Sequence, residues 1–418
     1  MVRGKLLLDE LRGKTIEYYI VKIFVIPATY NEGDNIEKFI TILEEEVFPM
    51  IKNHEMHILV ADDYSPDGTG QIVKKMMGKY KNLGINQGER KGLGAAYIRT
   101  MGEAIEKYGA DVVISIDADF QFDPHDLPKF IEKLDQGYDM VVQTRYSGGG
   151  SIPSNWPPHR KLFSIVANVF VRSVFMRFNI HDWTGGFRAI KKEVFQKVKP
   201  QMHDFRGYIF QIAFLHKSVR EGFKISEVPL HFSDRTLGNS KIAPIPYIFD
   251  VVKYVVIARI LELKRIIKFL IVGGTGFLVQ ITTQEFFARI VFASLINKSL
   301  RDGLSAGFGA ESAILSNFMF NNFWTFKDTK KIKENSTFFV RLIKFNLASF
   351  MSIAIQSTSV YFFVHILGEN FYILDFSVKT RLIVLVPTIV FLVVPLNYLV
   401  YNRIIWKTQY LKNEKTNK

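Results

Sequence analysis

The sequence predicts two domains of different class: an α/β domain in the first part of the chain and an all-α transmembrane bundle in the second. Short β-rich runs alternate with amphipathic helical segments between residue 20 and about residue 245. From about residue 266 onward, four long apolar stretches follow one another. The length of 418 residues is sufficient for two domains.

Four β-rich runs define the expected sheet. Helical patterns around 37–47 and 71–79 separate the first three of them. Such βαβ alternation favours a parallel sheet with helices on both faces. The runs are VKIFVIPATY (21–30), HILVADDYSPDGT (57–69), DVVISIDADF (111–120) and DMVVQTRY (139–146).

Polar residues stand at the carboxyl end of each predicted strand, which is the edge where parallel sheets bind ligands. They are Tyr30, Asn31 and Glu32; Asp62 and Asp63; Asp117 and Asp119; and Arg145. Side chains in a strand alternate with period two, so Asp117, Asp119 and Gln121 can present oxygens to one hard cation. Since Mg²⁺ is commonly held by one or two carboxylates together with phosphates, this pattern predicts a metal–diphosphate site.

The four apolar stretches cover residues 266–296, 304–326, 338–367 and 382–402, and the last has 21 residues without a charge. That length matches a bilayer span, and the alternative is a set of buried core helices. Lys and Arg number six in 327–344 and five in 403–418, against four in the loops 297–303 and 368–381. This asymmetry predicts a multi-pass protein with its α/β domain and both termini in the cytoplasm.

The expected domain order follows from these patterns. An N-terminal extension (1–20) precedes the α/β domain (21–243), and the membrane domain (266–402) is followed by a basic cytoplasmic tail (403–418). Residues 244–265 are apolar with basic residues toward their end, which is typical of an amphipathic helix on a membrane surface. The alternative is that they form the last helix of the soluble domain.

Composition limits the possible functions. The net charge of +14 is compatible with nucleic acid, an anionic membrane or a phosphorylated substrate. The basic residues gather beside the apolar stretches, so they are better explained as orientation signals than as a nucleic-acid surface. The chain contains no cysteine, which excludes disulfides and thiolate metal sites. The first 22 residues lack a long apolar core, so we expect no signal peptide.

Several motifs together resemble a known family. In order along the chain they are PATYNE (27–32), VADDYSPDGT (60–69), DADFQ (117–121), QTRY (143–146), NWPPHRKLFS (155–164), TGGFRA (184–189) and RTLGNSK (235–241). This set resembles the family 2 glycosyltransferases with the GT-A (Rossmann-like) fold, and within them the dolichol-phosphate mannose synthase group of polyprenyl-phosphate glycosyltransferases. Residues 266–402 resemble the four-helix GtrA-like membrane domain that is often fused to such enzymes.

The resemblance implies roles for individual residues. Those matching the nucleotide pocket are Pro27, Tyr30, Glu32, Ala61 and Asp63; those matching the metal and diphosphate site are Asp117, Ala118, Asp119 and Gln121. Those matching cations near both the donor diphosphate and the acceptor phosphate are Arg145, Arg235 and Lys241, and those matching the positions that meet the lipid phosphate are Arg145, Arg160 and Ser164. Asp119, Arg145, Arg235 and Lys241 would carry the chemistry. The first motif holds one residue more than the family pattern, so Ala28 could replace Pro27.

Some of these residues also have structural explanations. Glu32 could simply begin a helix, and Asp62 and Asp63 could belong only to a turn. The segment KGLGAAY (91–97) is better explained by close packing at a helix start than by a phosphate loop. We expect SGGGS (147–151) to be a flexible hinge before the acceptor loop. Glu285 and Glu311 are expected to make structural polar contacts in the bundle.

The function that this resemblance implies is inverting transfer of mannose from GDP-mannose to dolichyl or other polyprenyl phosphate, with Mg²⁺ or Mn²⁺ as cofactor. Transfer from UDP-glucose is the alternative, and a non-catalytic lipid-sugar binding or flippase component is another. A processive polysaccharide synthase is disfavoured because the chain lacks a Gln-x-x-Arg-Trp motif. Since a phosphate acceptor is already ionised near pH 7, no general base is expected. No carboxylate outside the metal and nucleotide sites should then be indispensable, and this includes Asp182 and Asp234.

Overall fold

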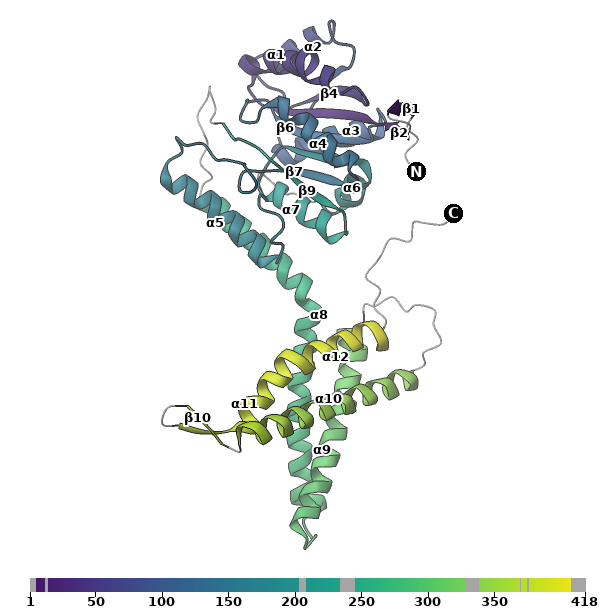
Figure 1. The fold of residues 1–418 in the computed structure, drawn as a ribbon, viewed down its shortest axis with the longest axis vertical. Helices are drawn as coiled ribbons and strands as arrows, with labels where there is room; N and C mark the ends of the chain where they lie inside the picture. Colours follow the sequence, from purple (N-terminus) through teal and green to yellow (C-terminus); the bar gives the residue numbers. More distant parts are fainter. Residues whose placement is uncertain are drawn as a thin grey trace. The chain divides into compact units, whose positions relative to one another are not determined.

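The computed structural model describes residues 5–11, 14–202, 208–233, 245–327, 338–368, 370–373 and 376–406. The chain forms two compact units, Met1–Arg259 and Ile260–Lys418 (Figure 1). The first unit is built around a β-sheet, and the second consists mainly of helices. Each unit therefore has the class that the sequence predicts.

The first unit contains a seven-stranded sheet with the order β5-β4-β3-β6-β8-β7-β9. Neighbours among β3 to β6 are parallel, β8 is antiparallel to both β6 and β7, and β9 is parallel to β7. All strands except β8 therefore run in one direction. The strands are β3 (Lys22–Thr29), β4 (Glu55–Asp62), β5 (Leu83–Gln87), β6 (Val112–Asp117), β7 (Met140–Thr144), β8 (Arg188–Lys191) and β9 (Ile225–Pro229).

The sheet is mixed, and the expectation of a parallel sheet is wrong at β8. The four strands expected from the sequence, β3, β4, β6 and β7, do share one direction, but β8 lies between β6 and β7. Its four residues, RAIK, are too few for a period-two pattern to be recognisable. The carboxyl ends of the four expected strands nevertheless meet at one edge of the sheet.

Helices cover both faces of the sheet, as expected. Alternate residues of β3 enter different cores: Ile23 and Val25 belong to one, Phe24 and Ile26 to the other. The first core is completed by α1 (Gly33–Ile42), α2 (Thr69–Met76) and α4 (Leu127–Asp135), and the second by α3 (Leu93–Glu106), α6 (Lys192–Val198) and α7 (Tyr208–Arg220).

Amphipathic spacing explains why these helices form and how they pack. In α4 the buried residues are Leu127, Phe130, Ile131 and Leu134, which lie on one helical face. A further helix, α5 (Pro158–Val174), buries only Asn168 and Val171. Short helical turns link the other elements: η1 (Leu43–Val47), η2 (Phe48–Met50), η3 (Pro124–Asp126) and η4 (Lys199–Gln201).

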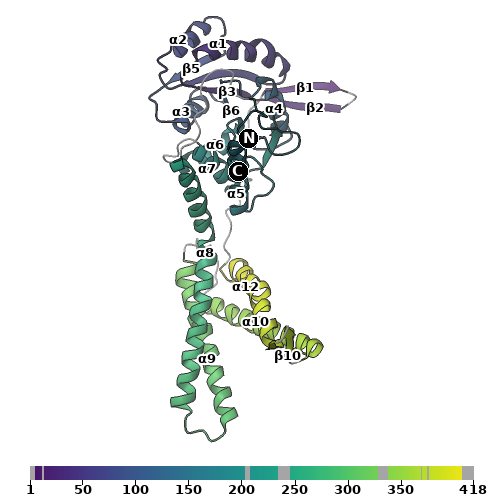
Figure 2. The ribbon, with the colours of Figure 1, turned by 90° about the vertical axis from the view of Figure 1, so that its left-hand side faces the viewer.

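The N-terminal extension forms a hairpin of its own. Strands β1 (Lys5–Leu11) and β2 (Lys14–Ile20) pair antiparallel, with Lys5 opposite Ile20 and Leu11 opposite Lys14 (Figure 2). They make a separate two-stranded sheet and are not part of the seven-stranded one.

The second unit contains long helices. Helices α8 and α9 lie side by side (Figure 2). Gly276 of α8 lies so close to α9 that a Cβ atom there would overlap the Asn317 side chain. The helical segments are α8 (Ile245–Phe286) with η5 (Phe287–Val291), α9 (Lys298–Phe320) with η6 (Asn321–Thr325), α10 (Phe338–Leu367), α11 (Thr380–Pro387), η7 (Thr388–Val393), α12 (Val394–Val400) and η8 (Tyr401–Ile405). A hairpin of β10 (Asn370–Ile373) and β11 (Phe376–Lys379) precedes α11.

Two helical segments in the described part of the chain are long and apolar enough to cross a bilayer: Phe338–Leu367 and Thr388–Ile405. The first coincides with the expected stretch 338–367, and the second overlaps the expected stretch 382–402. The number of four spans stays a prediction, as do the domain boundaries.

Residues 245–265 form the first part of α8, and the helix continues without a break to Phe286. Val255 is fully buried in the second core, and Tyr254 packs against the same core. Phe249 and Ile257 on other faces are exposed. This segment therefore has an amphipathic pattern and also packs on the α/β domain, as both explanations from the sequence require. Its position on a membrane surface stays a prediction.

Candidate active site

Strained backbone marks the carboxyl edge of the sheet. Asn31, Tyr64 and Phe120 have φ values of 60°, 46° and 57°, and they follow β3, β4 and β6 respectively. Non-glycine residues adopt this left-handed conformation rarely, and such residues concentrate at functional sites. Three of them at one edge agree with the ligand site that the sequence places there.

Strand register decides which side chains share a face at this edge. Ala28 of β3 is aligned with Ala61 of β4 and with Asp117 of β6, while Pro27 is aligned with Ile116. Because side chains alternate along strands, Ala28 lies on the face of Ala61 and Asp117 and Pro27 lies on the other. The geometry thus favours Ala28 over Pro27 as the pocket residue.

Two aspartates near the predicted nucleotide pocket stabilise the backbone. Asp62 is fully buried and accepts hydrogen bonds from Ser65 Oγ at 2.5 Å and Gln87 Nε2 at 2.9 Å. Asp67 Oδ2 accepts from the backbone N–H of Gly33 at 2.8 Å, at the first residue of α1. The turn explanation fits Asp62, whose Oδ2 also accepts from the backbone N–H of Ser65 at 3.3 Å.

Asp63 has a different environment. Its Oδ1 accepts a hydrogen bond from Arg99 Nη2 at 3.1 Å. Burial raises the pKa of this carboxyl, and Arg99 opposes the shift. Nearby, the Arg90 guanidinium lies 3.8 Å from the ring centroid of Tyr30. Neither arginine was expected, although both stand in the segment around KGLGAAY that the sequence singles out.

Glu32 stands at the N-cap position of α1, so the helix-start explanation fits its backbone. Its Oε2 accepts from Asn35 Nδ2 at 2.8 Å. A contact of Glu32 with the nucleotide stays a prediction.

Asp117 and Asp119, the acidic pair, are each held by a different hydrogen bond. Asp119 is 4% exposed, and its Oδ1 accepts from the backbone N–H of Gln121 at 3.1 Å, which closes a tight turn around Phe120. Asp117 ends β6, and its Oδ1 accepts from the hydroxyl of Tyr97 at 3.3 Å. Ala118 and Gln121 are buried beside them. Asp123 instead caps η3 through the N–H of His125.

Tyr97 is fully buried under this pair. Burial raises the pKa of its hydroxyl well above the ordinary value, and the negative charges of Asp117 and Asp119 raise it further. The hydroxyl therefore remains a hydrogen-bond donor. Tyr97 closes the KGLGAAY segment, whose helix α3 begins at Leu93, as close packing at a helix start predicts.

The donor set fits a divalent cation that takes its other ligands from a substrate. Among the described residues, no group of three or more His, Cys, Asp or Glu is arranged to hold a metal. Two carboxylates alone match the way proteins hold Mg²⁺ on phosphates.

The loop between residues 182 and 187 joins the acidic pair to the cationic part of the site. A Cβ atom at Gly186 would lie 3.3 Å from Asp117 Oδ2, so the loop passes close to this carboxylate. Fully buried Arg188 donates to the carbonyls of Gly185 and Trp183, at 2.8 and 3.0 Å, and fixes the loop.

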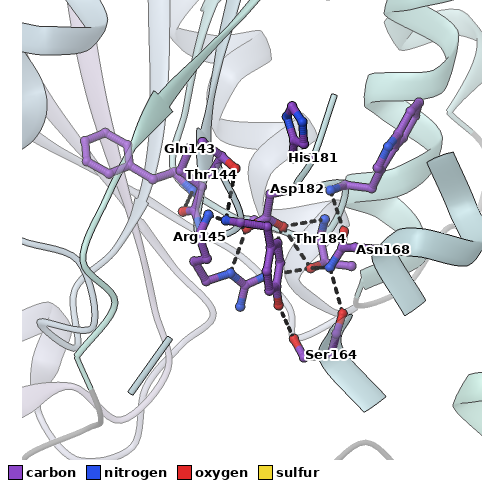
Figure 3. A network of polar contacts seen from close by, with 12 residues as sticks. Gln143, Thr144, Arg145, Ser164, Asn168, His181, Asp182 and Thr184 are labelled. Carbon is purple, nitrogen blue, oxygen red and sulfur yellow. Dashed lines mark hydrogen bonds and ion pairs between the residues drawn. The ribbon is translucent and has the colours of Figure 1, made fainter. Parts of the chain in front are cut away.

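At the other end of this loop, Asp182 and Thr184 hold Arg145 (Figure 3). Arg145 donates from Nε to Asp182 Oδ2 at 2.7 Å, and from Nη2 to Asp182 Oδ1 at 2.9 Å and Thr184 Oγ1 at 2.7 Å. Burial alone would raise the pKa of Asp182, but the ion pair and the hydrogen bonds bring it below its ordinary value. Asp182 is therefore a permanent anion that orients Arg145, a role that sequence reasoning missed.

Arg145 and Arg160 are linked through two aromatic rings. The Arg160 guanidinium lies 3.8 Å from the ring of Trp156, and Trp156 meets Phe232 edge to face at 5.6 Å. The guanidinium of Arg145 lies 5.4 Å from the same Phe232 ring. Ser164, on α5, shares a hydrogen bond of 2.5 Å with the hydroxyl of Tyr146. The structure thus brings together the three residues expected at the acceptor phosphate.

Other expectations have mixed outcomes. Arg235, Lys241 and Asp234 lie outside the described residues. The SGGGS segment forms a hydrogen-bonded turn: Gly150 N–H donates to Ser147, and Ser151 N–H donates to Leu230 of the chain beyond β9. Flexibility of this segment stays a prediction. Glu285 pairs with Arg289 at 2.6 Å, and Glu311 is exposed.

Comparison with known proteins identifies the family of this chain. A model described as glycosyl transferase family 2 matches residues 24–199, and one described as the GtrA/DPMS transmembrane domain matches residues 268–406. A dolichol-phosphate mannosyltransferase of Pyrococcus furiosus is 33% identical over 358 residues, which cover 84% of this chain and 93% of that protein. The chain belongs to glycosyltransferase family 2. The family and fold expected from the sequence are confirmed, and this glycosyltransferase is a membrane protein.

Two further comparisons concern parts of this glycosyltransferase. A polyprenol monophosphomannose synthase of Mycolicibacterium smegmatis is 33% identical over 224 residues, or 53% of this chain and 81% of that protein. A solved structure of a mannosyltransferase from Pyrobaculum calidifontis in complex with GDP-Man and Mn²⁺ has a TM-score of 0.37 and 17% identity, and covers 73% of this chain and 88% of that one.

Proposed function

We propose that this glycosyltransferase transfers mannose from GDP-mannose to dolichyl or another polyprenyl phosphate. The observation that carries the proposal is the loop of residues 182–187, which passes close to Asp117 and also contacts Arg145. One end passes Asp117, where a nucleotide diphosphate and its cation would bind, and the other holds Arg145. The names of the two relatives support the sugar and the lipid.

In the proposed reaction an oxygen of the lipid phosphate attacks the anomeric carbon of the donor sugar. A carbon–oxygen bond to the lipid phosphate forms as the bond to the nucleotide diphosphate breaks, and the diphosphate leaves with the electron pair. A single displacement inverts the configuration at that carbon. Arg145 and Arg160 would reduce the repulsion between the attacking and leaving phosphates and hold the acceptor in line.

No general base is required in this scheme. The phosphate monoester has a second pKa of about 6, so near pH 7 it is already mostly a dianion. Asp182 supports this reading, because its lowered pKa and its contacts with Arg145 make it a poor proton acceptor. An essential role for Asp182 would therefore act through Arg145.

Asp119 and Asp117 would hold a divalent cation, Mg²⁺ or Mn²⁺, together with phosphate oxygens of the donor, and Gln121 would assist. Such an ion neutralises charge that develops on the leaving diphosphate. The contribution of the chain itself is to hold both carboxylates in place at the strand end, which the Asp119 turn and the Tyr97 hydrogen bond provide.

A donor panel tests the proposal. Purified protein is incubated with polyprenyl phosphate and, separately, radiolabelled GDP-mannose, UDP-glucose and other nucleotide sugars, and label is counted in the organic phase. We expect label from GDP-mannose. Label from UDP-glucose alone would replace the sugar assignment, and no label from any donor would favour a non-catalytic lipid-sugar binding role.

A further inference from the structure

Helix α5 buries an asparagine although almost none of its other residues is buried. Asn168 is 2% exposed, and the only other buried residue of the helix is Val171. Leu162, Phe163 and Val166 of the same helix are all more than half exposed. Burying an amide is costly unless its donor and acceptor are both satisfied. The partners of Asn168 therefore indicate what the residue does.

Both ends of the Asn168 amide are used, and both reach the site loop (Figure 3). Its Oδ1 accepts from the backbone N–H of Trp183 at 2.7 Å. Its Nδ2 donates to the carbonyl of Ser164 at 3.0 Å and lies 3.5 Å from Thr184 Oγ1. One side chain thus connects α5 to two consecutive residues of the 182–187 loop.

Thr184 links Asn168 to Arg145 through its hydroxyl group. Its hydroxyl donates to Asp182 Oδ1 at 3.1 Å and accepts from Arg145 Nη2 at 2.7 Å. A hydroxyl has one donor and two acceptor positions, so the contacts with Asp182, Arg145 and Asn168 use all of them. The position of the Thr184 hydroxyl is therefore set jointly by α5 and by the Arg145–Asp182 pair.

A second connection runs through Tyr146, the residue after Arg145. Its hydroxyl shares a hydrogen bond with Ser164 Oγ, while Asn168 holds the Ser164 carbonyl. From the opposite side, Glu227 of β9 accepts from the N–H groups of His181 and Asp182 and fixes the start of the loop. The first residues of the loop are thus held by β9 on one side and by α5 on the other.

We propose that Asn168 is a positioning residue that couples α5, where the lipid phosphate would bind, to the orientation of Arg145. The inference rests on the proposed function, because it assigns the acceptor to Arg160 and Ser164. Neither Asn168 nor Thr184 need touch a substrate. Breaking the link should impair use of the acceptor and leave the nucleotide pocket, built from β3, β4 and β6, unchanged.

The variant Asn168→Asp tests this coupling with little change in shape. It keeps an oxygen for the Trp183 N–H and removes the donor to Ser164 and Thr184. Asn179→Asp is the matched control, since it adds the same charge at an exposed position after α5. Wild type and both variants are compared by kcat and KM for polyprenyl phosphate and for GDP-mannose, by GDP affinity in calorimetry, and by Tm.

We expect Asn168→Asp to lower kcat/KM for the lipid at least tenfold, with GDP affinity within about twofold of wild type. Its Tm should fall, because a buried carboxylate then faces the Ser164 carbonyl. Asn179→Asp should match wild type throughout. If kcat/KM for polyprenyl phosphate in Asn168→Asp equalled the wild-type value, the proposed coupling would be wrong. A loss of GDP affinity equal to the loss in acceptor kinetics would overturn it too, because it would indicate a general packing role.

A double variant with Thr184→Val checks that the two residues act through one path. If they do, Asn168→Asp with Thr184→Val loses no more than the worse single variant, whereas losses that multiply would contradict a shared path. Wild-type protein that forms no lipid-linked mannose contradicts the proposed function itself. If wild type forms lipid-linked mannose and Asn168→Asp has the same kcat/KM for polyprenyl phosphate, only the coupling is contradicted.

Discussion

Asp182 lies fully buried against Arg145, and this pairing decides which group controls the pH dependence of transfer. Its pKa is below the ordinary carboxyl value, so the carboxylate is ionised throughout pH 5–8 and its stabilising effect is lost only at more acidic pH. We therefore expect the rate to rise up to about pH 6, where the lipid phosphate loses its second proton, and then to level off.

The Asp182→Asn variant separates this explanation from base catalysis. Because it leaves Arg145 without its buried partner, it should lower the rate by roughly two orders of magnitude at every pH, without moving the inflection. Initial rates between pH 5 and 8.5 measure this, with thermal unfolding as the check on folding. An inflection that moves or disappears in the variant would assign the proton transfer to Asp182.

Tyr97 gives a second prediction at the scale of one residue. Tyr97→Phe keeps the ring that packs in the core and removes the hydrogen bond to Asp117. A hydrogen bond to a charged group contributes about 1.5–3 kcal/mol, so Mn²⁺-dependent GDP binding should weaken about tenfold or more. Calorimetry of GDP with Mn²⁺ measures it, and exposed Tyr108→Phe is the control. GDP affinity equal to wild type would exclude a positioning role for Tyr97.

Among the elements, the loop of residues 182–187 contains two adjacent glycines with different constraints. A Cβ atom at Gly185 would lie 2.4 Å from Cγ of buried Gln143, whereas one at Gly186 would lie 3.3 Å from Asp117 Oδ2. Gly185→Ala should therefore lower Tm by several degrees, because overpacking costs about 1–3 kcal/mol. Gly186→Ala should keep Tm near the wild-type value and weaken GDP binding in the presence of Mn²⁺.

The two measurements, Tm and GDP affinity, distinguish these effects in the same pair of proteins. If Gly186→Ala lowered Tm as much as Gly185→Ala while GDP affinity stayed unchanged, the close approach of the loop to Asp117 would be only a packing feature.

The same loop marks the limit of what sequence patterns can predict. The strands β3, β4, β6 and β7 were recognisable because each is a run of buried apolar residues that ends in polar ones. The position of β8 and the partnership of Asp182 with Arg145 were not, since they depend on contacts between segments 37 residues apart. A lone aspartate in HDWTGG has no pattern that distinguishes an ion-pair partner from a base or a surface residue.

At the scale of the whole molecule, the orientation in the membrane is a proposal based on the distribution of Lys and Arg. Residues 1–265 carry the proposed site for a nucleotide sugar, and we place them in the cytoplasm. The basic segments 327–344 and 403–418 should lie on the same side of the membrane. The loop that contains β10 and β11 should lie outside. Because the chain has no cysteine, a single introduced cysteine reports its own side without background.

We expect Ser377→Cys to react with a membrane-impermeant thiol reagent in intact cells and Lys330→Cys to react only after the membrane is permeabilised. The two variants serve as controls for each other, since each should be labelled in opened cells. Ser377 lies in β11, in a loop with few basic residues, and Lys330 lies in the most basic segment between two apolar stretches. The positive-inside rule acts on short loops of this kind, so both positions should be informative. Labelling of Lys330→Cys in intact cells would reverse the proposed orientation and place the catalytic domain outside the cytoplasm.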